Sequence, residues 1–252
     1  MIWGYVFGVG GSPSTPIKLN MDDYCHALIT GASGSGKSYA LLYLLGSLLQ
    51  SYPETEIFFC DFKNSTDFAF LKDYSYYYGG DDCYTGVMKF YEKFCTSRTR
   101  GSNSRRRLLI FDEYPAFINY LSMKDKADKT KKTNDVLSVI AEVLMLGRGI
   151  RYGVWIVTQR ADASLFANGA RDNFMIVVGL GRMSKEQKTM IFAGEEMPQR
   201  IFQRGEGMLL ADGHAITEVK YPKINGISNW KNHIIAILKK YECIADLGQD
   251  AP

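Results

Sequence analysis

The chain has 252 residues, enough for one large α/β domain with a substantial core and too few for two full-sized domains beside a nucleotide-binding module. Its 30 lysines and arginines against 27 aspartates and glutamates leave a net charge of +3, which does not by itself indicate a nucleic-acid partner. The five cysteines are odd in number and lack a Cys-x-x-Cys spacing, which indicates neither a disulfide framework nor a zinc site. Because no apolar run approaches the roughly 20 residues of a membrane span and no signal peptide is evident, we expect a cytoplasmic protein without a membrane segment of its own.

The first 20 residues contain two short apolar or alternating runs, residues 1–9 and 16–20, separated by Gly10-Gly11-Ser12-Pro13. Such runs predict a small strand pair. Because no repeat or low-complexity linker divides the rest of the chain, we expect residues 1–20 to pack on a single α/β domain formed by residues 21–252.

A phosphate-binding loop follows the apolar run 27–29. Its residues, Gly31-Ala32-Ser33-Gly34-Ser35-Gly36-Lys37-Ser38, fit the pattern G-x-x-x-x-G-K-[ST] in full. The glycines let consecutive N–H groups face one anion, Lys37 adds charge for the β- and γ-phosphates, and Ser38 supplies a hydroxyl for Mg²⁺. Residues 39–49 predict a buried helix whose positive end faces the phosphates, so Tyr39 is counted with the nucleotide-binding residues.

Residues 56–61 predict a buried strand that ends in Asp61-Phe62-Lys63. Polar residues at the carboxyl end of such a strand face the ligand crevice of a parallel sheet. Lys63 is therefore a candidate functional residue, although a solvated loop lysine fits equally well. The tyrosine-rich stretch 74–80 can stack on bases, but half-buried surface filler explains it better. Residues 84–95 predict an amphipathic helix.

Two basic stretches are candidates for contact with nucleic-acid phosphates. Residues 97–107 hold five arginines among glycine and serine, for which a solvated loop and a backbone contact are equally good interpretations. Residues 124–132 hold five lysines and two aspartates, which predicts a mobile loop that tracks DNA. The candidate DNA contacts are Arg105, Arg106, Arg107, Lys129, Lys131 and Lys132.

The apolar run 108–111 leads directly into Asp112 and Glu113. In this Walker B arrangement Asp112 holds Mg²⁺ and Glu113 polarises the attacking water. An ordinary strand end with exposed acids is the alternative, which the complete phosphate-binding motif makes much weaker. Residues 134–145 predict a helix and residues 152–158 the next buried strand. That strand ends at Gln159, where the side chain can sense the γ-phosphate or position water.

The remaining elements complete an α/β fold with a mainly parallel central sheet flanked by helices. Residues 172–180 predict a further core strand, and residues 184–192 a helix with Ser184 and Gln187 in a capping box. Residues 207–211 and 215–219 predict a C-terminal β-hairpin, and residues 230–241 a closing amphipathic helix.

In this order the motifs resemble the motor domain of the FtsK/SpoIIIE branch of the HerA–FtsK superfamily of P-loop ATPases. The resemblance covers residues 20–225, nearly the whole chain. It rests on GASGSGKS at 31–38, Asp61-Phe62-Lys63 where the family has Asp-Pro-Lys, LLIFDE at 108–113, GIRYGVWIVTQR at 149–160, ARDNF at 170–174 and GEGMLL at 205–210. Many NTPases share the Walker motifs, so the Thr-Gln-Arg strand end and the late Gly-x-Gly-Met-Leu segment are the features that narrow the resemblance to this family.

The resemblance implies a RecA-like fold, a hexameric ring, hydrolysis of ATP with Mg²⁺ between subunits, and double-stranded DNA in the central pore. It also implies catalytic help from an arginine of a neighbouring subunit. The candidates are Arg148, Arg160 and Arg171. Arg148 ranks first, although an arginine at a helix end can also simply neutralise carbonyls there.

Chromosome pumps of the family carry membrane helices, a long linker and a winged-helix DNA reader, for which this chain has no room. A motor of this size suits mobile elements, as a coupling ATPase for conjugative transfer or as a viral genome-packaging ATPase. A relaxase, a membrane protein or a capsid protein would then recruit it. The polar stretch between Asp61 and Phe68 favours the coupling proteins of Gram-positive mobile elements.

Two other functional classes stay open. The first is a nucleotide-dependent switch or scaffold that binds a protein partner without DNA pumping, against which the intact Glu113 argues. The second is a small-molecule kinase, which Gln159 and the lack of an evident lid segment disfavour.

Overall fold

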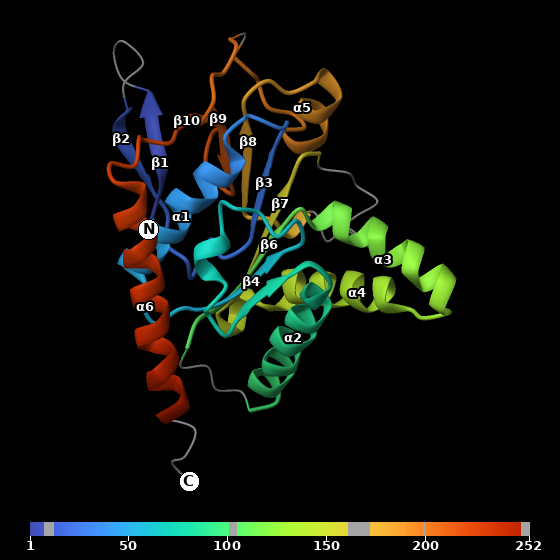
Figure 1. The fold of residues 1–252 in the computed structure, drawn as a ribbon. Coiled ribbons are helices and arrows are strands. Elements are labelled where there is room, and N and C mark those ends of the chain that lie inside the picture. The colour runs from blue at the N-terminus through green and yellow to red at the C-terminus, as the bar shows by residue number, and fades with distance from the viewer. Residues whose placement is uncertain (8–12, 101–104, 161–171, 199, 248–252) are drawn as a thin grey trace.

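A single ten-stranded sheet forms the centre of the computed structural model, which describes residues 1–7, 13–100, 105–160, 172–198 and 200–247 (Figure 1). The strands are β1 (Ile2–Phe7), β2 (Pro13–Lys18), β3 (Ala27–Gly31), β4 (Glu56–Asp61), β5 (Tyr77–Gly79), β6 (Arg107–Asp112), β7 (Tyr152–Thr158), β8 (Ile176–Leu180), β9 (Glu206–Ala211) and β10 (Thr217–Lys220). Across the sheet they follow the order β2-β1-β10-β9-β8-β3-β7-β6-β4-β5. Neighbours from β8 to β5 pair in parallel, whereas the pairs from β2 to β8 are antiparallel. The predicted α/β class with a mainly parallel core is confirmed.

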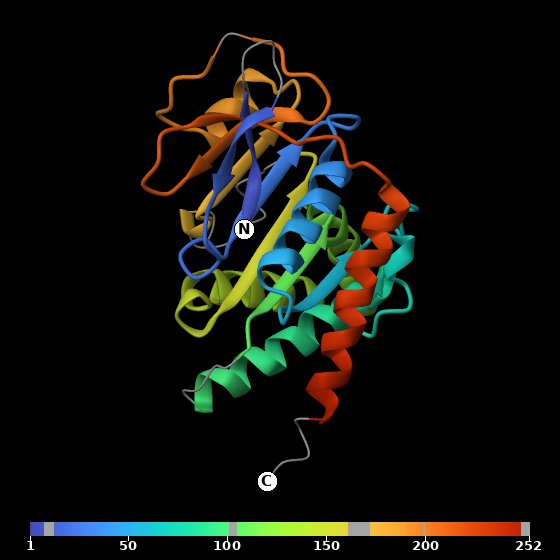
Figure 2. The same ribbon diagram turned by 90° about the vertical axis from the view of Figure 1, so that its left-hand side faces the viewer.

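Alternation along the buried strands explains why helices cover both faces of this sheet. In β4, Ile57 and Phe59 belong to one core cluster, whereas Phe58 and Cys60 belong to the other. The helices that complete these two clusters are α1 (Lys37–Ser51) and α6 (Ile227–Leu247) for the first, and α2 (Cys83–Arg100), α3 (Tyr114–Asp128) and α4 (Lys132–Leu146) for the second. Figure 2 shows α1 and α6 side by side on the face turned toward the viewer.

The order of the parallel strands gathers the predicted motifs at one edge. Strands β3, β7, β6 and β4 are consecutive neighbours, so their carboxyl ends meet there. The phosphate-binding loop follows β3, Gln159 follows β7, Asp112 ends β6, and Asp61 ends β4. The first candidate for a ligand site is therefore this edge.

The stretch 124–132, predicted to be a loop, is mostly helical. Helix α3 runs to Asp128 and α4 begins at Lys132, which leaves residues 129–131 as a tight turn. Asp125 closes the turn, because its carboxylate accepts hydrogen bonds from the backbone N–H groups of Lys132 and Thr133 at 3.0 and 2.8 Å. Lysine and alanine are good helix formers, so the charges that suggested a loop also suit a solvated helix end.

The arginine-rich stretch 97–107 also contains more regular structure than a loop. Helix α2 continues to Arg100, and Arg107 is already the first residue of β6. The predicted strand 172–180, by contrast, begins only at Ile176.

The hairpin of β9 and β10 lies inside the sheet. Strand β9 pairs with β8, and β10 pairs with β1. The hairpin therefore joins the N-terminal strand pair to the parallel core (Figure 1). In the described ranges, no helix combines the length and apolar character that a membrane crossing requires.

Candidate nucleotide-binding site

The phosphate-binding loop has the backbone that its glycines predict. Gly34 and Gly36 have φ of 82° and 98°, in the left-handed region that favours glycine. A Cβ on Gly36 would lie 2.8 Å from the backbone nitrogen of Gly205. Gly205 itself donates that N–H to the carbonyl of Ser35 at 2.8 Å. The late Gly-x-Gly-Met-Leu segment therefore supports the loop from behind, which accounts for the pairing of these two motifs in one sequence.

Lys37 is buried at the start of α1 and lies within the loop. Its Nζ donates to the carbonyl oxygens of Gly31 at 2.6 Å and Ala32 at 3.2 Å. Burial lowers the pKa of Lys37, although the carboxylates of Glu113 and Asp112 act in the opposite direction. An ammonium at the first turn of a helix is a fitting place for the phosphates of a nucleotide.

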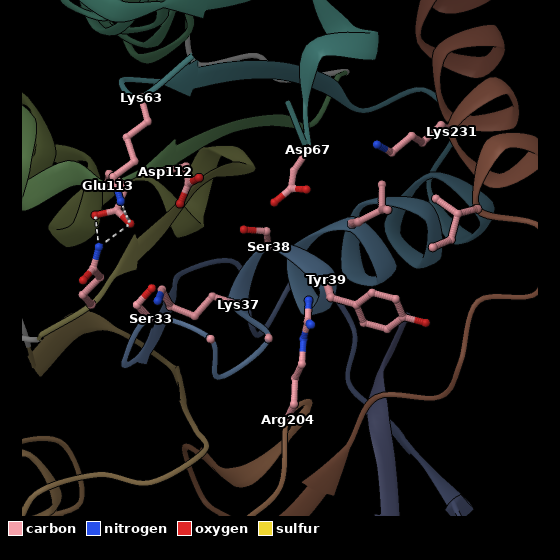
Figure 3. Close-up of a pocket in the computed structure, with 15 residues that line it drawn as sticks. Ser33, Lys37, Ser38, Tyr39, Lys63, Asp67, Asp112, Glu113, Arg204 and Lys231 are labelled. Carbon is pink, nitrogen blue, oxygen red and sulfur yellow. Dashed lines mark hydrogen bonds and ion pairs between the residues drawn. The ribbon is translucent and has the colours of Figure 1, made fainter. Parts of the chain in front are cut away.

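A cavity of about 390 Å³ opens beside this loop (Figure 3). At one end it is bordered by the polar strand-end residues Lys63, Asp112, Glu113 and Gln159. On the opposite side Figure 3 shows Tyr39, Arg204 and Lys231, with Asp67 between the two groups, and Leu42 and Ile227 also line the cavity. The polar end suits phosphates, and the mixed end has the apolar and cationic side chains that suit a nucleoside.

Asp112 and Asp61 sit side by side at the ends of β6 and β4, where they are register partners. Burial, the charge of Glu113 and the charge of Asp61 raise the pKa of Asp112 to about 7, against the opposite influence of Lys63 and Lys37. A carboxyl in this setting gains from a nearby cation. The hydroxyl of Ser38 borders the same cavity as the carboxyl of Asp112. Both groups offer oxygen ligands of the kind that Mg²⁺ prefers, so Ser38 and Asp112 fit a magnesium site.

Glu113 occupies the junction between β6 and α3 in a left-handed conformation, with φ of 59°. This conformation is costly for a residue other than glycine, by about 1 kcal/mol, and such residues are often found at functional sites. The Glu113 carboxylate receives Lys63 Nζ at 2.6 Å and Gln159 Nε2 at 3.1 and 3.3 Å. Three side chains from the ends of β4, β6 and β7 are thus brought together, as the strand-end interpretation predicts.

Neither Arg148 nor Arg160, two of the three arginine candidates for a neighbour's site, borders the cavity that these residues share. Arg148 lies at the opposite edge of the sheet, ahead of β7, where its guanidinium is 3.2 Å from a carboxylate oxygen of Asp23. Arg160 directly follows Gln159, but its side chain is 74% exposed and borders a separate cavity. Arg171 lies outside the described residues. A role across a subunit interface stays a prediction for all three.

Sequence reasoning missed Arg204 and the start of α6 as part of the site. Arg204 immediately precedes Gly205, so its contact with the loop could have been inferred from the Gly-x-Gly-Met-Leu motif. Ile227 and Lys231 come from a helix that follows the last strand, and only tertiary packing places them here. That packing is held by the Tyr39 hydroxyl, which donates to the carbonyl of Pro222 at 3.2 Å.

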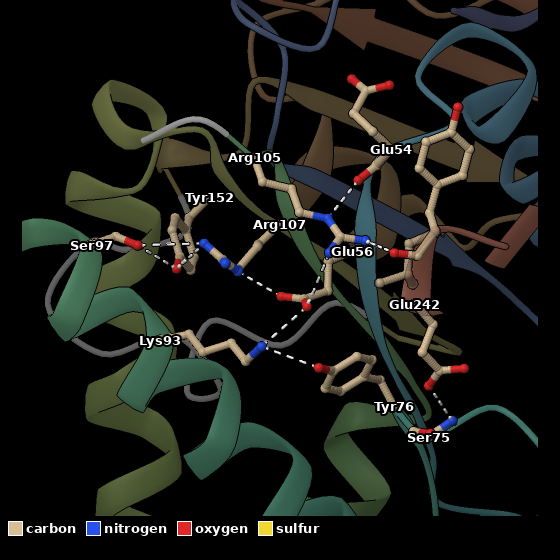
Figure 4. A network of polar contacts seen from close by, with 12 residues as sticks. Glu54, Glu56, Ser75, Tyr76, Lys93, Ser97, Arg105, Arg107, Tyr152 and Glu242 are labelled. Atoms are coloured by element: carbon tan, nitrogen blue, oxygen red, sulfur yellow. Dashed lines mark hydrogen bonds and ion pairs between the residues drawn. The ribbon is translucent and has the colours of Figure 1, made fainter. Parts of the chain in front are cut away.

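Arg105, Arg106 and Arg107, which the sequence analysis predicts to contact DNA, have partners within the chain. Arg106 is buried and binds Asp22 at 2.8 Å. Arg107 lies 2.6 Å from Glu56, and Arg105 donates to two backbone carbonyls (Figure 4). These guanidinium groups are engaged at the amino-terminal edge of the sheet, where Arg105 and Arg106 precede β6.

Lys129, Lys131 and Lys132 are exposed at the α3–α4 turn. In Figure 1 the two helices project together from the body of the molecule, with this turn at their far end. The Lys132 ammonium lies 5.1 Å from the centre of the Tyr84 ring, whose carbon face does not neutralise its charge. The turn is therefore an exposed basic surface of the described structure.

No protein-family model matches the chain. Among curated proteins it is similar to the FtsK domain-containing protein YdcQ of Bacillus subtilis (strain 168), with 31% identity over 197 residues. That match covers 71% of this chain and 39% of YdcQ, so the chain spans about two fifths of the length of that relative.

Several solved structures share the fold. EssC (ATPases 2 and 3) from Geobacillus thermodenitrificans matches with a TM-score of 0.70 and 14% identity over 96% of this chain and 49% of that chain. The pCW3 conjugation coupling protein TcpA, solved with ATPγS, matches with a TM-score of 0.70 and 18% identity over 89% of this chain and 68% of that chain. The genome packaging NTPase B204 from Sulfolobus turreted icosahedral virus 2 matches with a TM-score of 0.52 and 16% identity over 81% of this chain and 100% of that chain. These matches establish a RecA-like P-loop ATPase fold.

Proposed function

Because this chain is a P-loop ATPase of the FtsK/HerA type, we propose that it hydrolyses ATP to move double-stranded DNA. The observation that carries the proposal is the convergence of Lys37, Asp112, Glu113 and Gln159 on one cavity. A protein that only binds nucleotide has no need of the buried carboxylate and its positioning amide.

Each side chain has a defined task in this proposal. Lys37 and the loop N–H groups bind the phosphates, and Ser38 with Asp112 would hold Mg²⁺, which neutralises charge on the phosphates when bound. Glu113 accepts a proton from the attacking water or polarises it, and Gln159 orients the Glu113 carboxylate through its two contacts.

DNA contact is assigned to the α3–α4 turn. The three exposed lysines there can neutralise backbone phosphates without reading sequence. We further propose a homo-hexameric ring in which the turn faces the DNA and an arginine of one subunit, Arg148, Arg160 or Arg171, completes the site of the next.

In its most specific form, the proposal is that the chain moves the DNA of a mobile element during transfer between cells. Its support is the likeness to TcpA, which is named as a conjugation coupling protein. The likeness to B204, named as a genome packaging NTPase, supports packaging as the alternative cargo pathway. A relaxase, membrane or capsid partner would recruit the motor.

A second candidate function is the handling of a protein partner without DNA pumping. EccC of Thermomonospora curvata, named as a type VII secretion ATPase, has the same fold with a TM-score of 0.62, and a related structure of it holds a signal sequence peptide. The two functions differ in what stimulates the ATPase.

The deciding experiment measures ATP hydrolysis by the purified chain with and without linear double-stranded DNA, with Lys37→Ala as the blank. Stimulation by duplex DNA is the expected result. Hydrolysis that is indifferent to DNA in a protein that binds ATP and forms rings would contradict the DNA motor and favour the protein-handling alternative.

A further inference from the structure

The residue that should activate water is held by a cation in this structure. Lys63 Nζ lies 2.6 Å from Glu113 Oε1, and the Glu113 side chain is only 11% exposed. Gln159 contacts both carboxylate oxygens of Glu113, and the Lys63 ammonium lies against Oε1, where it competes with a water molecule for that oxygen.

Lys63 is built differently from the other lysine at the phosphate end of the cavity. Lys37 is buried and fixed by two carbonyl oxygens, whereas the Lys63 side chain is 48% exposed. Within the described part of the chain, Glu113 is the ion-pair partner of Lys63. Among the described residues, movement of the Lys63 ammonium would consequently give up this ion pair and its weaker attraction to Asp112.

The backbone under Lys63 is fixed, so its movement is confined to the side chain. Asp61 accepts a hydrogen bond from the N–H of Ser65 at 2.8 Å through its carboxylate, and from the N–H of Asn64 at 3.2 Å through its carbonyl. A further contact from the Tyr77 hydroxyl to Asp61, at 3.2 Å, ties the loop to β5. A long flexible side chain on a rigid loop can swing between two nearby anions.

The second anion would be the γ-phosphate, which is the terminal phosphate of ATP. Lys63, Glu113, Lys37 and Ser38 border the same cavity, and in Figure 3 Lys63 reaches down to Glu113 from the side opposite the loop. A terminal phosphate carries about two negative charges at neutral pH, against one on Glu113, and has more oxygens to accept hydrogen bonds. ADP lacks this group.

We propose that Lys63 leaves Glu113 for the terminal phosphate when ATP binds, so that Glu113 becomes free to act on water only when a triphosphate fills the site. This mechanism rests on the proposed function, because it requires ATP as the nucleotide. It makes Lys63 a sensor of the γ-phosphate. It also prevents Glu113 from activating water while ADP occupies the site.

The test measures the affinities of ATPγS and ADP in the presence of Mg²⁺, without any reading of hydrolysis or of DNA. In Lys63→Met the affinity for ATPγS should fall about tenfold, the usual size of a lost charge-assisted hydrogen bond, while that for ADP stays within about twofold. Lys63→Arg should retain the preference for ATPγS. The matched control is Lys231→Met at the opposite end of the cavity, which should change both affinities by the same factor.

A double-variant comparison tests whether Lys63 is shared with Glu113. Glu113→Gln removes the competing charge, so it should tighten ATPγS binding by about threefold in the native background and not at all beside Lys63→Met. Equal losses for both nucleotides in Lys63→Met, or equal tightening in both backgrounds, would overturn the sensor. A native chain that binds neither nucleotide would instead overturn the proposed ATPase function.

Discussion

Gln159 donates through one nitrogen to both carboxylate oxygens of Glu113, at 3.1 and 3.3 Å. An amide placed across a carboxylate in this way restricts the rotation of the carboxylate. The pair joins the ends of β6 and β7, so its geometry is set by the sheet.

Removing this amide should slow the chemical step more than it weakens binding. In Gln159→Ala we expect kcat to fall about a hundredfold, at the lower end of the range for lost acid–base positioning, with KM for ATP within about threefold. Steady-state hydrolysis assays measure both. The matched control is Gln50→Ala on the exposed end of α1, which should leave both constants unchanged. A rise in KM with native kcat would instead assign Gln159 to ground-state binding of ATP.

Glu113→Gln should separate nucleotide binding from turnover. Because the amide keeps the shape of the side chain but cannot take a proton, we expect hydrolysis to fall by about a thousandfold or more, with ATPγS still bound. Lys37→Ala should lose both properties. Nucleotide binding by fluorescence, next to hydrolysis, checks this. Hydrolysis retained within about tenfold in Glu113→Gln would exclude Glu113 as the residue that activates water.

The α3–α4 turn should contribute to the salt dependence of DNA binding. In Lys129→Ala/Lys131→Ala/Lys132→Ala, the slope of log affinity against log salt should become shallower by about 0.9 for each lost phosphate contact. The affinity loss should be similar for unrelated duplex sequences. Lys239→Ala/Lys240→Ala, on the exposed face of α6, is the control with nearly the same charge change and should keep the native slope. An unchanged slope in the triple variant would remove the turn from the DNA interface.

Glu56 should make folding stability depend on acid pH. Its side chain is 2% exposed and lies within 3.1 Å of Lys93 and 2.6 Å of Arg107 (Figure 4). Burial alone would raise the pKa of Glu56, but the charges and hydrogen bonds of Lys93 and Arg107 outweigh it, so the pKa is lowered below 4.5. A lowered folded-state pKa means that the stabilisation is complete above the unfolded-state pKa and is lost as the pH falls through the folded-state pKa.

The variant Glu56→Gln should therefore be less stable than the native chain at pH about 7, by about 3 kcal/mol, since it leaves two half-buried cations without the charge of their buried partner. The difference should shrink as the pH approaches 4. Urea unfolding at several pH values measures both the difference in the free energy of unfolding and its dependence on pH. Glu92→Gln, an exposed carboxylate on α2, is the control and should change stability by less than about 0.5 kcal/mol. A destabilisation of Glu56→Gln that is independent of pH would point to lost packing, with no role for the ionised pair.

The parts of the fold with a single physical cause could be predicted from the sequence. Strand β7 was predicted with its observed ends because all of Tyr152–Thr158 is buried, and a fully buried parallel strand appears as an uninterrupted apolar run. The capping of α5 (Lys185–Ile191) by Ser184, which accepts from the N–H of Gln187, was equally local. These features depend on neighbours in the sequence.

The arginines show why other parts could not be predicted. Nothing near Arg107 reveals that its partner is Glu56, a buried carboxylate 51 positions earlier. The same holds for Lys231, which reaches the nucleotide cavity only through the docking of α6 on α1. A charged run has the same local appearance whether it meets solvent, DNA or a distant acid.

The pairing of β1 with β10 has a consequence for any shortened version of the protein. Strand β10 would be the last strand on its side of the sheet if residues 1–20 were removed, because β1 is its outer neighbour. An open strand edge presents unpaired N–H and C=O groups to solvent and templates the addition of strands from other molecules. Removing the first strands would therefore move the open edge of the sheet from β2, where Pro13 and Pro16 offer no N–H to an incoming strand, to β10.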